Sequence, residues 1–461
     1  MATESFGEPA SGSMSSGVRF RLSVMMFLQF FIWGAWFELG FDYIPTLGFN
    51  KEWQQPLVFG AFNVGALVAL FFSTQFADRK FAAERFLAVS HFIGGLAILL
   101  LFFLPGNKEN PAPFWPFFAL MLVHSIFYVP TISITNSIAF ANLSDPARQF
   151  GPVRLWGTIG WIAASWPFIF ILVDWARVPA IGDTGGIFDW IGTALGTSKA
   201  GADASSAQRY IFLVAGAAAL LLALISPALP HTPPKPAAAG ADSLAWVKAI
   251  RLLKHPFVAV LFLVTFIDAA VHQSFFYWTA SFLKTDVGIK ANWVTPVMKI
   301  GQLAEIITML FLGFVLKRLG WRMTMVLGVL GHAGRFAVFA FWPEPAPAVL
   351  INVLHGICYA FFFATVYIFV DEYFPKDVRS SAQGLFNVLI LGVGPFLANF
   401  ACGRLGAKYT AGDKLEYSAV FVYSLGAALI GALILALFFH PTKPAEDPGF
   451  SRAEEDAPPV A

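Results

Sequence analysis

Three side chains between residues 154 and 161 have the types and the spacing to bind a polar solute. Arg154, Thr158 and Trp161 lie at i, i+4 and i+7, which places a cation, a hydroxyl and an aromatic ring on one face of a helix. The surrounding residues are apolar, and an ionisable group inside a membrane span costs several kcal/mol. Because such a group is kept where it serves function, this face is a candidate binding site.

A second polar face occurs in the second half of the chain. Gln302 and Glu305 lie at i and i+3, one turn after Lys299. Glu305 carries the charge opposite to that of Arg154 and occupies an equivalent place in its half. An unpaired arginine in hydrocarbon is very costly, so we predict that Arg154 and Glu305 form a functional pair. Lys299 is either a structural counter-ion or a side chain that extends to its helix end.

Amide and aromatic groups from other apolar runs complete the candidate site. Gln273 and Gln302 each offer a donor and an acceptor on one side chain. Tyr359 offers a ring for stacking, and His355, one turn earlier, can titrate near neutral pH. These groups suit a neutral, polar, ring-containing solute better than an inorganic ion or a lipid, and they do not separate nucleosides from sugars.

Other polar residues inside apolar runs receive simpler interpretations. Asp268 and His272 lie at i and i+4 in one run. Asp42 is expected near the outer interface without an assigned role. His332 is expected to be a hydrogen-bonded packing residue, and Arg335 a structural counter-ion or a side chain that extends from a helix end.

The composition predicts a membrane protein. Hydrophobic residues make up 57% of the 461 residues and charged residues only 13%, whereas soluble domains contain about 25% charged residues. This excludes a soluble enzyme, a disordered chain and a nucleic-acid-binding domain, and it predicts the lipid bilayer as the surroundings. The two cysteines lie in apolar runs, and no paired metal-ligand spacing or hydrolase motif occurs there. We therefore expect no enzyme activity, no metal and no cofactor.

Twelve apolar runs are long enough for membrane-spanning helices, which need about 20 residues each. They start near residues 21, 55, 82, 113, 150, 208, 255, 292, 321, 346, 379 and 415. The predicted fold is an all-α polytopic membrane protein. The bias of Lys and Arg toward one side places both termini in the cytoplasm. The long loop over residues 174–209 is then outside, either as a lid over an outer vestibule or as a flexible insertion.

The chain divides into two halves of six spans. A Pro-rich segment with Pro233, Pro234 and Pro236 interrupts the helices after the sixth span. We predict a cytoplasmic tail (1–20), a first half (21–230), a linker (231–254), a second half (255–440) and a second tail (441–461). Within the linker, residues 244–255 form either an interfacial amphipathic helix or a solvated one. Basic turns near residues 76–85 and 313–322 occupy matching positions in the halves, which is typical of major facilitator transporters.

Several motifs carry a family resemblance along nearly the whole chain. They are LQFFIWGAW (28–36), YVPT (128–131), RLWGTIG (154–160), QLAE (302–305), GRFA (334–337) and RSSAQG (379–384). In these motifs the sequence resembles the bacterial nucleoside:proton symporter family of the major facilitator superfamily.

The resemblance implies uptake of nucleosides with protons across the bacterial inner membrane, by a monomer that alternates access between its two halves. It assigns substrate binding to Arg154, Thr158, Trp161, Gln273, Gln302, Glu305 and Tyr359. Glu305 and Arg154 would couple the proton, with His355 as a further titratable group.

Two positions depart from the family pattern. Phe276 replaces an asparagine, and Ala360 replaces an aspartate of the tenth span. The second change removes a carboxylate, so an uncoupled nucleoside uniporter is one alternative. A transporter of the same fold for sugars or another small polar solute is the other.

Overall fold

The structure, a computed structural model, is almost entirely helical and describes residues 15–72, 82–144, 146–234, 250–374, 379–412 and 414–441. The first half contains α1 (Ser16–Tyr43), α2 (Gln54–Phe72), α4 (Ala83–Leu101), α5 (Phe114–Asn142), α6 (Pro146–Ala163), α7 (Trp166–Ile171), α8 (Ile187–Gly196), α9 (Gly201–Gln208) and α10 (Tyr210–Ile225). The second contains α12 (Pro256–Thr285), α13 (Val294–Phe341), α14 (Pro345–Leu350), α15 (Leu354–Cys358), α16 (Thr365–Tyr373), α17 (Arg379–Asn387), α18 (Gly394–Lys408) and α19 (Tyr417–Phe438). A short antiparallel pair, β1 (Thr410–Ala411) and β2 (Lys414–Leu415), precedes α19.

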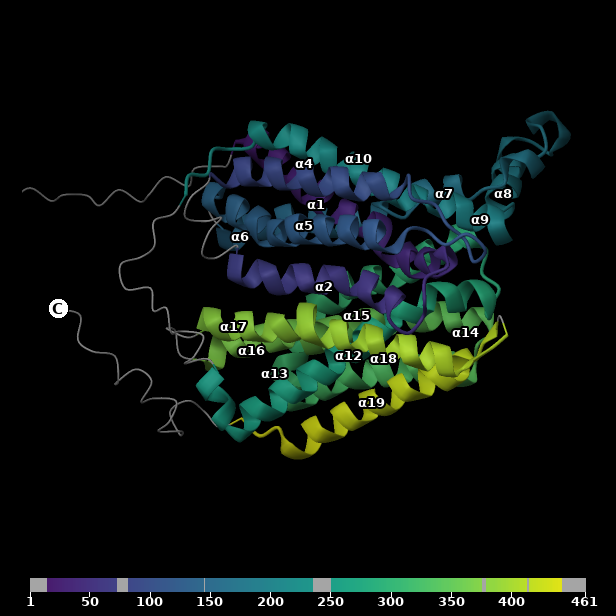
Figure 1. Ribbon diagram of the computed structural model, residues 1–461. Helices are drawn as coiled ribbons and strands as arrows, with labels where there is room; N and C mark the ends of the chain where they lie inside the picture. Colours follow the sequence, from purple (N-terminus) through teal and green to yellow (C-terminus); the bar gives the residue numbers. More distant parts are fainter. Residues whose placement is uncertain are drawn as a thin grey trace, which may run out of the picture.

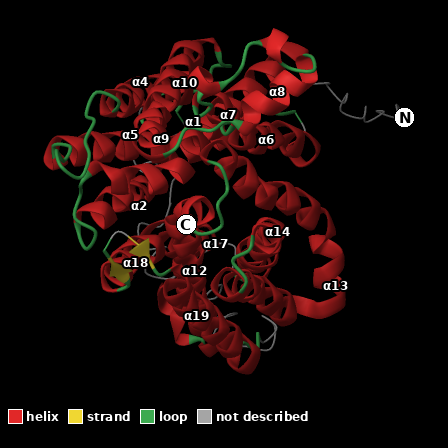
Figure 2. Ribbon diagram, turned by 90° about the vertical axis from the view of Figure 1, so that its right-hand side faces the viewer, coloured by secondary structure: helices red, strands yellow, loops and turns green. Residues whose placement is uncertain are grey.

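The helices of the two halves form two bundles that lie side by side. Figure 1 shows α1, α2, α4, α5, α6 and α10 above, and α12 to α19 below, and the view in Figure 2 separates the same two groups. The bundles meet where α1 packs against α12 and where α2 packs against α18. The polar side chains of α1 and α12 therefore lie at the junction of the two bundles.

The described helices have the lengths and surfaces of a membrane protein. Nine helical stretches among the described residues are long and apolar enough to cross a bilayer. Their outer surfaces carry large apolar side chains, and Leu224, Leu310 and Phe314 are 77%, 79% and 63% exposed. Wide apolar surfaces are unusual on soluble proteins but match hydrocarbon. The prediction of an all-α, multi-pass membrane protein is confirmed, and the number of twelve spans stays a prediction.

One of these stretches holds two predicted spans. α13 has 48 residues, which at about 1.5 Å per residue is roughly 72 Å, more than twice the thickness of a bilayer core. Gly320 divides it, because its φ of 70° and ψ of 174° are not helical. Only glycine adopts this backbone conformation readily. The basic turn was predicted over residues 313–322, and this length is wrong, because the helix continues on both sides of Gly320.

Other predicted boundaries agree less closely or fall outside the described residues. α1 begins at Ser16, so the expected tail (1–20) loses its last residues to this helix. Most of the basic turn at residues 76–85 and the first half of the predicted linker helix (244–255) lie outside the described residues. The end of that linker is described as a short 3₁₀ turn, Leu252–Lys254.

Glycines allow two helix pairs to approach closely and thereby position the candidate site. A Cβ on Gly160 would lie 2.1 Å from the carbonyl oxygen of Phe27, so α6 and α1 touch along their backbones. A Cβ on Gly356 would lie 2.3 Å from the backbone nitrogen of Glu305, so α15 and α13 touch in the same way. Small residues at such crossings are the usual means of close helix packing in membranes.

Two helices of the second half contain π-helical segments. They are η9 (Tyr359–Ala364), between α15 and α16, and η10 (Val388–Val393), between α17 and α18. π-bulges inside α-helices occur often at functional sites because they rotate the following side chains. The first segment begins at the predicted binding residue Tyr359 and includes Ala360.

The long loop after α7 contains short helices and reaches the other bundle. It forms α8 and α9, and an isolated bridge joins Val173 to Ser198. The carbonyl oxygens of Leu195 and Gly196 accept hydrogen bonds from three side chains that lie just before α13: Lys290 (2.5 Å), Asn292 (2.9 Å) and Trp293 (3.0 Å). These hydrogen bonds join the loop to the second bundle at the end that carries α8 and α9 (Figure 1).

Candidate functional site

The first polar face lies on α6 and is packed against α1. The guanidinium carbon of Arg154 lies 4.0 Å from the centre of the Phe30 ring, within the range of a cation–π contact. Gly157 leaves the space that this guanidinium occupies, because a Cβ there would lie 2.6 Å from Nη1 of Arg154. The indole of Trp161 meets the Trp33 ring edge to face at 5.1 Å. Arg154, Trp161 and the intervening Thr158 are all partly exposed.

The second polar face, on α13, lies opposite the first. The Nζ atom of Lys299 lies 4.3 Å from the centre of the Trp161 ring, which brings the two faces together. Arg154 lies within electrostatic range of both Glu305 and Tyr359. Arg154 and Glu305 form no ion pair with each other, so the direct pairing expected from the sequence is not present. The structure therefore brings the charges of the two halves near each other without joining them.

A different ion pair joins the two halves. Nζ of Lys299 lies 2.9 Å from Oε1 of Glu38 on α1, and the two side chains are 4% and 0% exposed. Lys299 is thus a structural counter-ion, as one of the two sequence interpretations had it, and does not extend to a helix end. Sequence reasoning did not place Glu38 in the site. Its only signal was a carboxylate in the apolar run that also contains Trp33 and Trp36.

The two predicted glutamines lie in different surroundings. Gln302 on α13 is buried, and its Oε1 atom has no hydrogen-bond partner among the described residues. Gln273 on α12 donates from Nε2 to Oδ1 of Asn399 at 2.8 Å. Asn399 in turn donates to Oδ1 of Asn63 on α2 at 3.2 Å, so Gln273 belongs to a chain of amides that crosses between the bundles. Gln302 is therefore the glutamine with unused hydrogen-bonding capacity.

Aromatic rings surround the space between these faces. Phe37 of α1 contacts Phe276 of α12 at 5.2 Å and Trp161 at 6.3 Å between ring centres. Trp33 stacks on Phe62 of α2 at 4.8 Å. Phe276 therefore adds an apolar ring to the space between the two faces.

The tenth-span residues divide between two environments. Tyr359 is partly exposed and lies within electrostatic range of Glu305 as well as of Arg154. His355 is buried, and its Nδ1 accepts a hydrogen bond of 2.8 Å from Arg335. The structure thus brings Tyr359 to the predicted pair and places His355 inside the second bundle.

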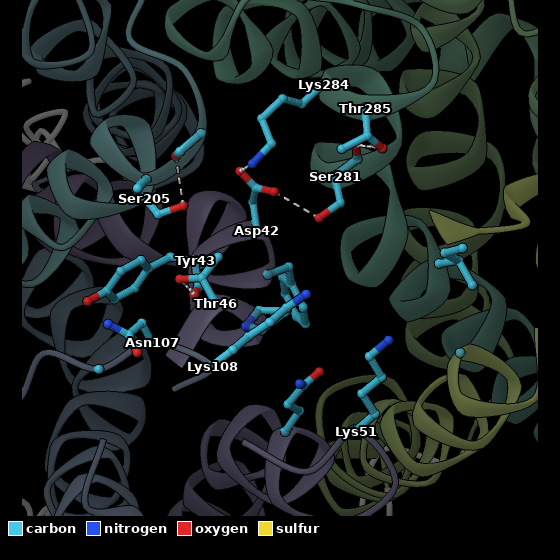
Figure 3. Close-up of a pocket in the computed structure, with 18 of the residues that line it drawn as sticks. Asp42, Tyr43, Thr46, Lys51, Asn107, Lys108, Ser205, Ser281, Lys284 and Thr285 are labelled. Atoms are coloured by element: carbon cyan, nitrogen blue, oxygen red, sulfur yellow. Dashed lines mark hydrogen bonds and ion pairs between the residues drawn. The ribbon is translucent and has the colours of Figure 1, made fainter. Parts of the chain in front are cut away.

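A large cavity opens at the end that carries α8 and α9. Its volume is about 1130 Å³, and it is lined by residues of both bundles and of α9. Figure 3 shows Asp42 at its centre, with Ser281 and Lys284 of α12 directed toward the carboxylate. Oδ1 of Asp42 accepts from Ser281 at 2.9 Å, and Oδ2 accepts from Gln208 at 2.5 Å and pairs with Lys284. Asp42, which had no assigned role, therefore connects α1 to α9 and α12.

Comparison with known proteins gives the family. The Nucleoside H+ symporter family matches residues 16–182 and 184–444. The chain belongs to this family. It is 32% identical over 430 residues to the putative nucleoside transporter YegT of Escherichia coli (strain K12), covering 91% of this chain and 92% of the relative. It is 25% identical to the nucleoside permease NupG of the same strain, covering 92% and 96%.

Solved structures confirm the fold. The crystal structure of the nucleoside transporter NupG superposes with a TM-score of 0.74 at 23% identity, covering 92% of this chain and all of that one. A D-xylose-proton symporter gives a TM-score of 0.64 at 14% identity. The predictions of a major facilitator fold, of nucleoside transport coupled to protons, and of a transporter rather than an enzyme are confirmed. The chain is a multi-pass inner-membrane protein.

Proposed function

We propose that the nucleoside binds between the polar faces of α6 and α13. The observation that supports this most directly is the approach of Lys299 to Trp161 at 4.3 Å, which sets the two faces against each other. In this site Trp161 and Tyr359 stack on the base, and the free Oε1 of Gln302 accepts a hydrogen bond from the base edge or the ribose. Arg154, Thr158 and Glu305 bind ribose hydroxyls. Gln273 supports the site through Asn399.

Glu305 and Arg154 serve as coupling residues in this proposal. Arg154 lies near Glu305 without an ion pair, so a ribose hydroxyl can lie between the two groups. When Glu305 is ionised, it attracts Arg154 and accepts hydrogen bonds from the ribose. Protonation of Glu305 removes this attraction and changes the balance between the two orientations of the halves.

Alternating access requires one end of the molecule to close while the other opens. Contacts of Asp42 with Ser281 and Lys284 join the bundles at the end that carries α8 and α9. The charge bias of the loops makes this the outer end, with both termini in the cytoplasm. We assign the Asp42 contacts to an outer gate of a monomeric transporter, with lipid around the bundle and without a nucleic-acid partner.

The test is uptake of labelled uridine and adenosine into proteoliposomes with and without an inward proton gradient. Gradient-stimulated, saturable uptake that sugars do not inhibit is expected. Saturable uptake at the same rate with and without the proton gradient would indicate a uniporter. Inhibition by sugars alone would refute the nucleoside site.

A variant tests the coupling residue itself. Glu305→Gln keeps the shape of the side chain and removes its titration, so accumulation against a gradient is expected to be lost while counterflow exchange remains. Unchanged accumulation by this variant would remove Glu305 from the coupling role.

A further inference from the structure

Five ionisable side chains form a cluster inside the second bundle, apart from the binding faces. Asp268 and His272 come from α12, His332 and Arg335 from the second part of α13, and His355 from α15. Asp268, His332 and Arg335 are 0% exposed and His355 is 3% exposed. Charged groups at such depth are rare in membrane proteins and mark ion or proton pathways. We refer to these five residues as the His–Arg–Asp cluster.

Arg335 is the centre of the cluster and fixes the protonation of two histidines. Its Nη1 donates to Nδ1 of His355 and its Nη2 donates to Nδ1 of His332, both at 2.8 Å. A guanidinium has donors only, so both imidazoles accept at Nδ1 and carry their proton on Nε2. Neither ring can gain a second proton at Nδ1 without losing its hydrogen bond from Arg335. The guanidinium itself is held over the Phe275 ring, 3.7 Å from its centre.

Asp268 is the group in the cluster that lacks hydrogen bonds. Neither of its carboxylate oxygens has a hydrogen-bond partner among the described residues. Nε2 of His332 lies 3.7 Å from Oδ2, beyond hydrogen-bonding distance, and it too has no hydrogen-bond partner in the described part of the chain. A fully buried carboxylate without donors is costly, and each such group in a native structure needs an explanation.

The side chains that interact with Asp268 leave its carboxylate as the group that can take up an added proton. Within the described residues they are His332 and Arg335 from α13 and Cys358 from α15. A metal does not explain the cluster, because no group of described His, Cys, Asp and Glu side chains has the arrangement of a metal site. The positive guanidinium would also repel a cation.

The cluster is connected to the junction of the two bundles. The His272 ring stacks on His355 at 5.1 Å, and His355 lies within electrostatic range of Lys299. Lys299 forms the ion pair with Glu38 that joins α13 to α1. A change of charge in the cluster therefore acts on the contact between the halves through two neighbouring side chains.

We propose that Asp268 is a second proton-binding site of this transporter, distinct from Glu305, and that the His–Arg–Asp cluster transmits its charge to the Glu38–Lys299 pair. The carboxylate takes its proton from a hydronium ion of the aqueous phase, so one O–H bond forms on Asp268, one O–H bond of hydronium breaks, and water is released. The net charge of the Arg335 and Asp268 pair changes from zero to +1. The proposal rests on the proposed proton symport.

The experiment compares Asp268→Asn with the wild-type chain in proteoliposomes. An inward gradient of one pH unit supports about tenfold accumulation per coupled proton. The variant is expected to lose this gradient-driven component of uridine accumulation while counterflow exchange and thermal stability remain. Asp189→Asn makes the same chemical change at an exposed position of α8 and is expected to behave as wild type. Asp268→Glu is expected to restore part of the gradient dependence, which a purely structural role would not require.

The outcomes separate the two proposals. Wild-type uptake without gradient stimulation would refute the proton symport itself. Wild-type stimulation that Asp268→Asn retains in full would refute the role of Asp268 alone. If the asparagine variant does not fold, infrared difference spectra of the wild type and of Glu305→Gln between two pH values replace it. A carboxylic acid band that remains in Glu305→Gln supports a second protonated carboxyl, and its complete loss would overturn the proposal.

Discussion

The Glu38–Lys299 ion pair offers a quantitative test of how the two bundles are held together. At 2.9 Å and an effective dielectric constant of about 20, the attraction between the two charges is about 6 kcal/mol. Removal of both side chains from water offsets much of this energy. Loss of one partner leaves a buried charge alone, and the expected cost is about 3–5 kcal/mol.

Single and double variants measure this cost. Glu38→Gln and Lys299→Met are each expected to lower the free energy of unfolding by about 3–5 kcal/mol. The double variant removes both charges and is expected to lose less than the sum of the single losses, with a coupling of about 2 kcal/mol or more. Thermal unfolding in detergent provides the stability, and uridine counterflow shows whether each variant is folded and functional.

A matched control comes from an exposed pair. Arg177 and Asp174 lie 3.1 Å apart with the arginine 78% exposed, and such pairs contribute only about 0–1 kcal/mol. Asp174→Asn is therefore expected to leave the unfolding temperature almost unchanged. Additive losses in the Glu38 and Lys299 variants, or single losses as small as that of the control, would refute the ion pair as a connection between the bundles.

Two further substitutions test helix packing and substrate stacking. Gly356→Ala places a Cβ 2.3 Å from the Glu305 backbone nitrogen and is expected to lower the free energy of unfolding by about 1–3 kcal/mol or more. Gly426→Ala, which meets open space, is expected to be tolerated. Equal stability of the two variants would contradict the close crossing. Trp161→Leu removes a ring whose stacking contributes about 0.5–1.5 kcal/mol to binding. The KM for uridine is therefore expected to rise roughly 2- to 10-fold with protein yield unchanged. An unaltered KM would remove Trp161 from the site.

The features predicted best from the sequence were those that depend on residues close together in the chain. Apolar runs and motifs such as RLWGTIG gave the fold and the family, because each depends on neighbouring residues. Helical spacing placed Arg154 and Trp161 on one face of α6, and the structure has both beside α1. The place of Glu305 near Arg154 followed from the equivalence of the two halves.

The features that were missed depend on contacts between distant segments. Glu38 and Asp42 receive their partners from the other half of the chain, and no spacing within α1 indicates which residues those are. His332 is hydrogen-bonded, as expected, but its partner is the arginine one turn later and its other nitrogen faces Asp268. The prediction of a direct Arg154–Glu305 ion pair was wrong, because the positions of these side chains depend on the distance between the two bundles.

The hydrogen bonds between the α7–α9 loop and the residues before α13 have a consequence for the resting protein. Three side chains of the second bundle donate to the carbonyl oxygens of Leu195 and Gly196. At about 1 kcal/mol each, they favour by about 3 kcal/mol the arrangement in which the loop contacts the second bundle. A movement that separates the bundles at this end must break these three bonds, so the form reached by that movement is raised in free energy by this amount unless new contacts replace them.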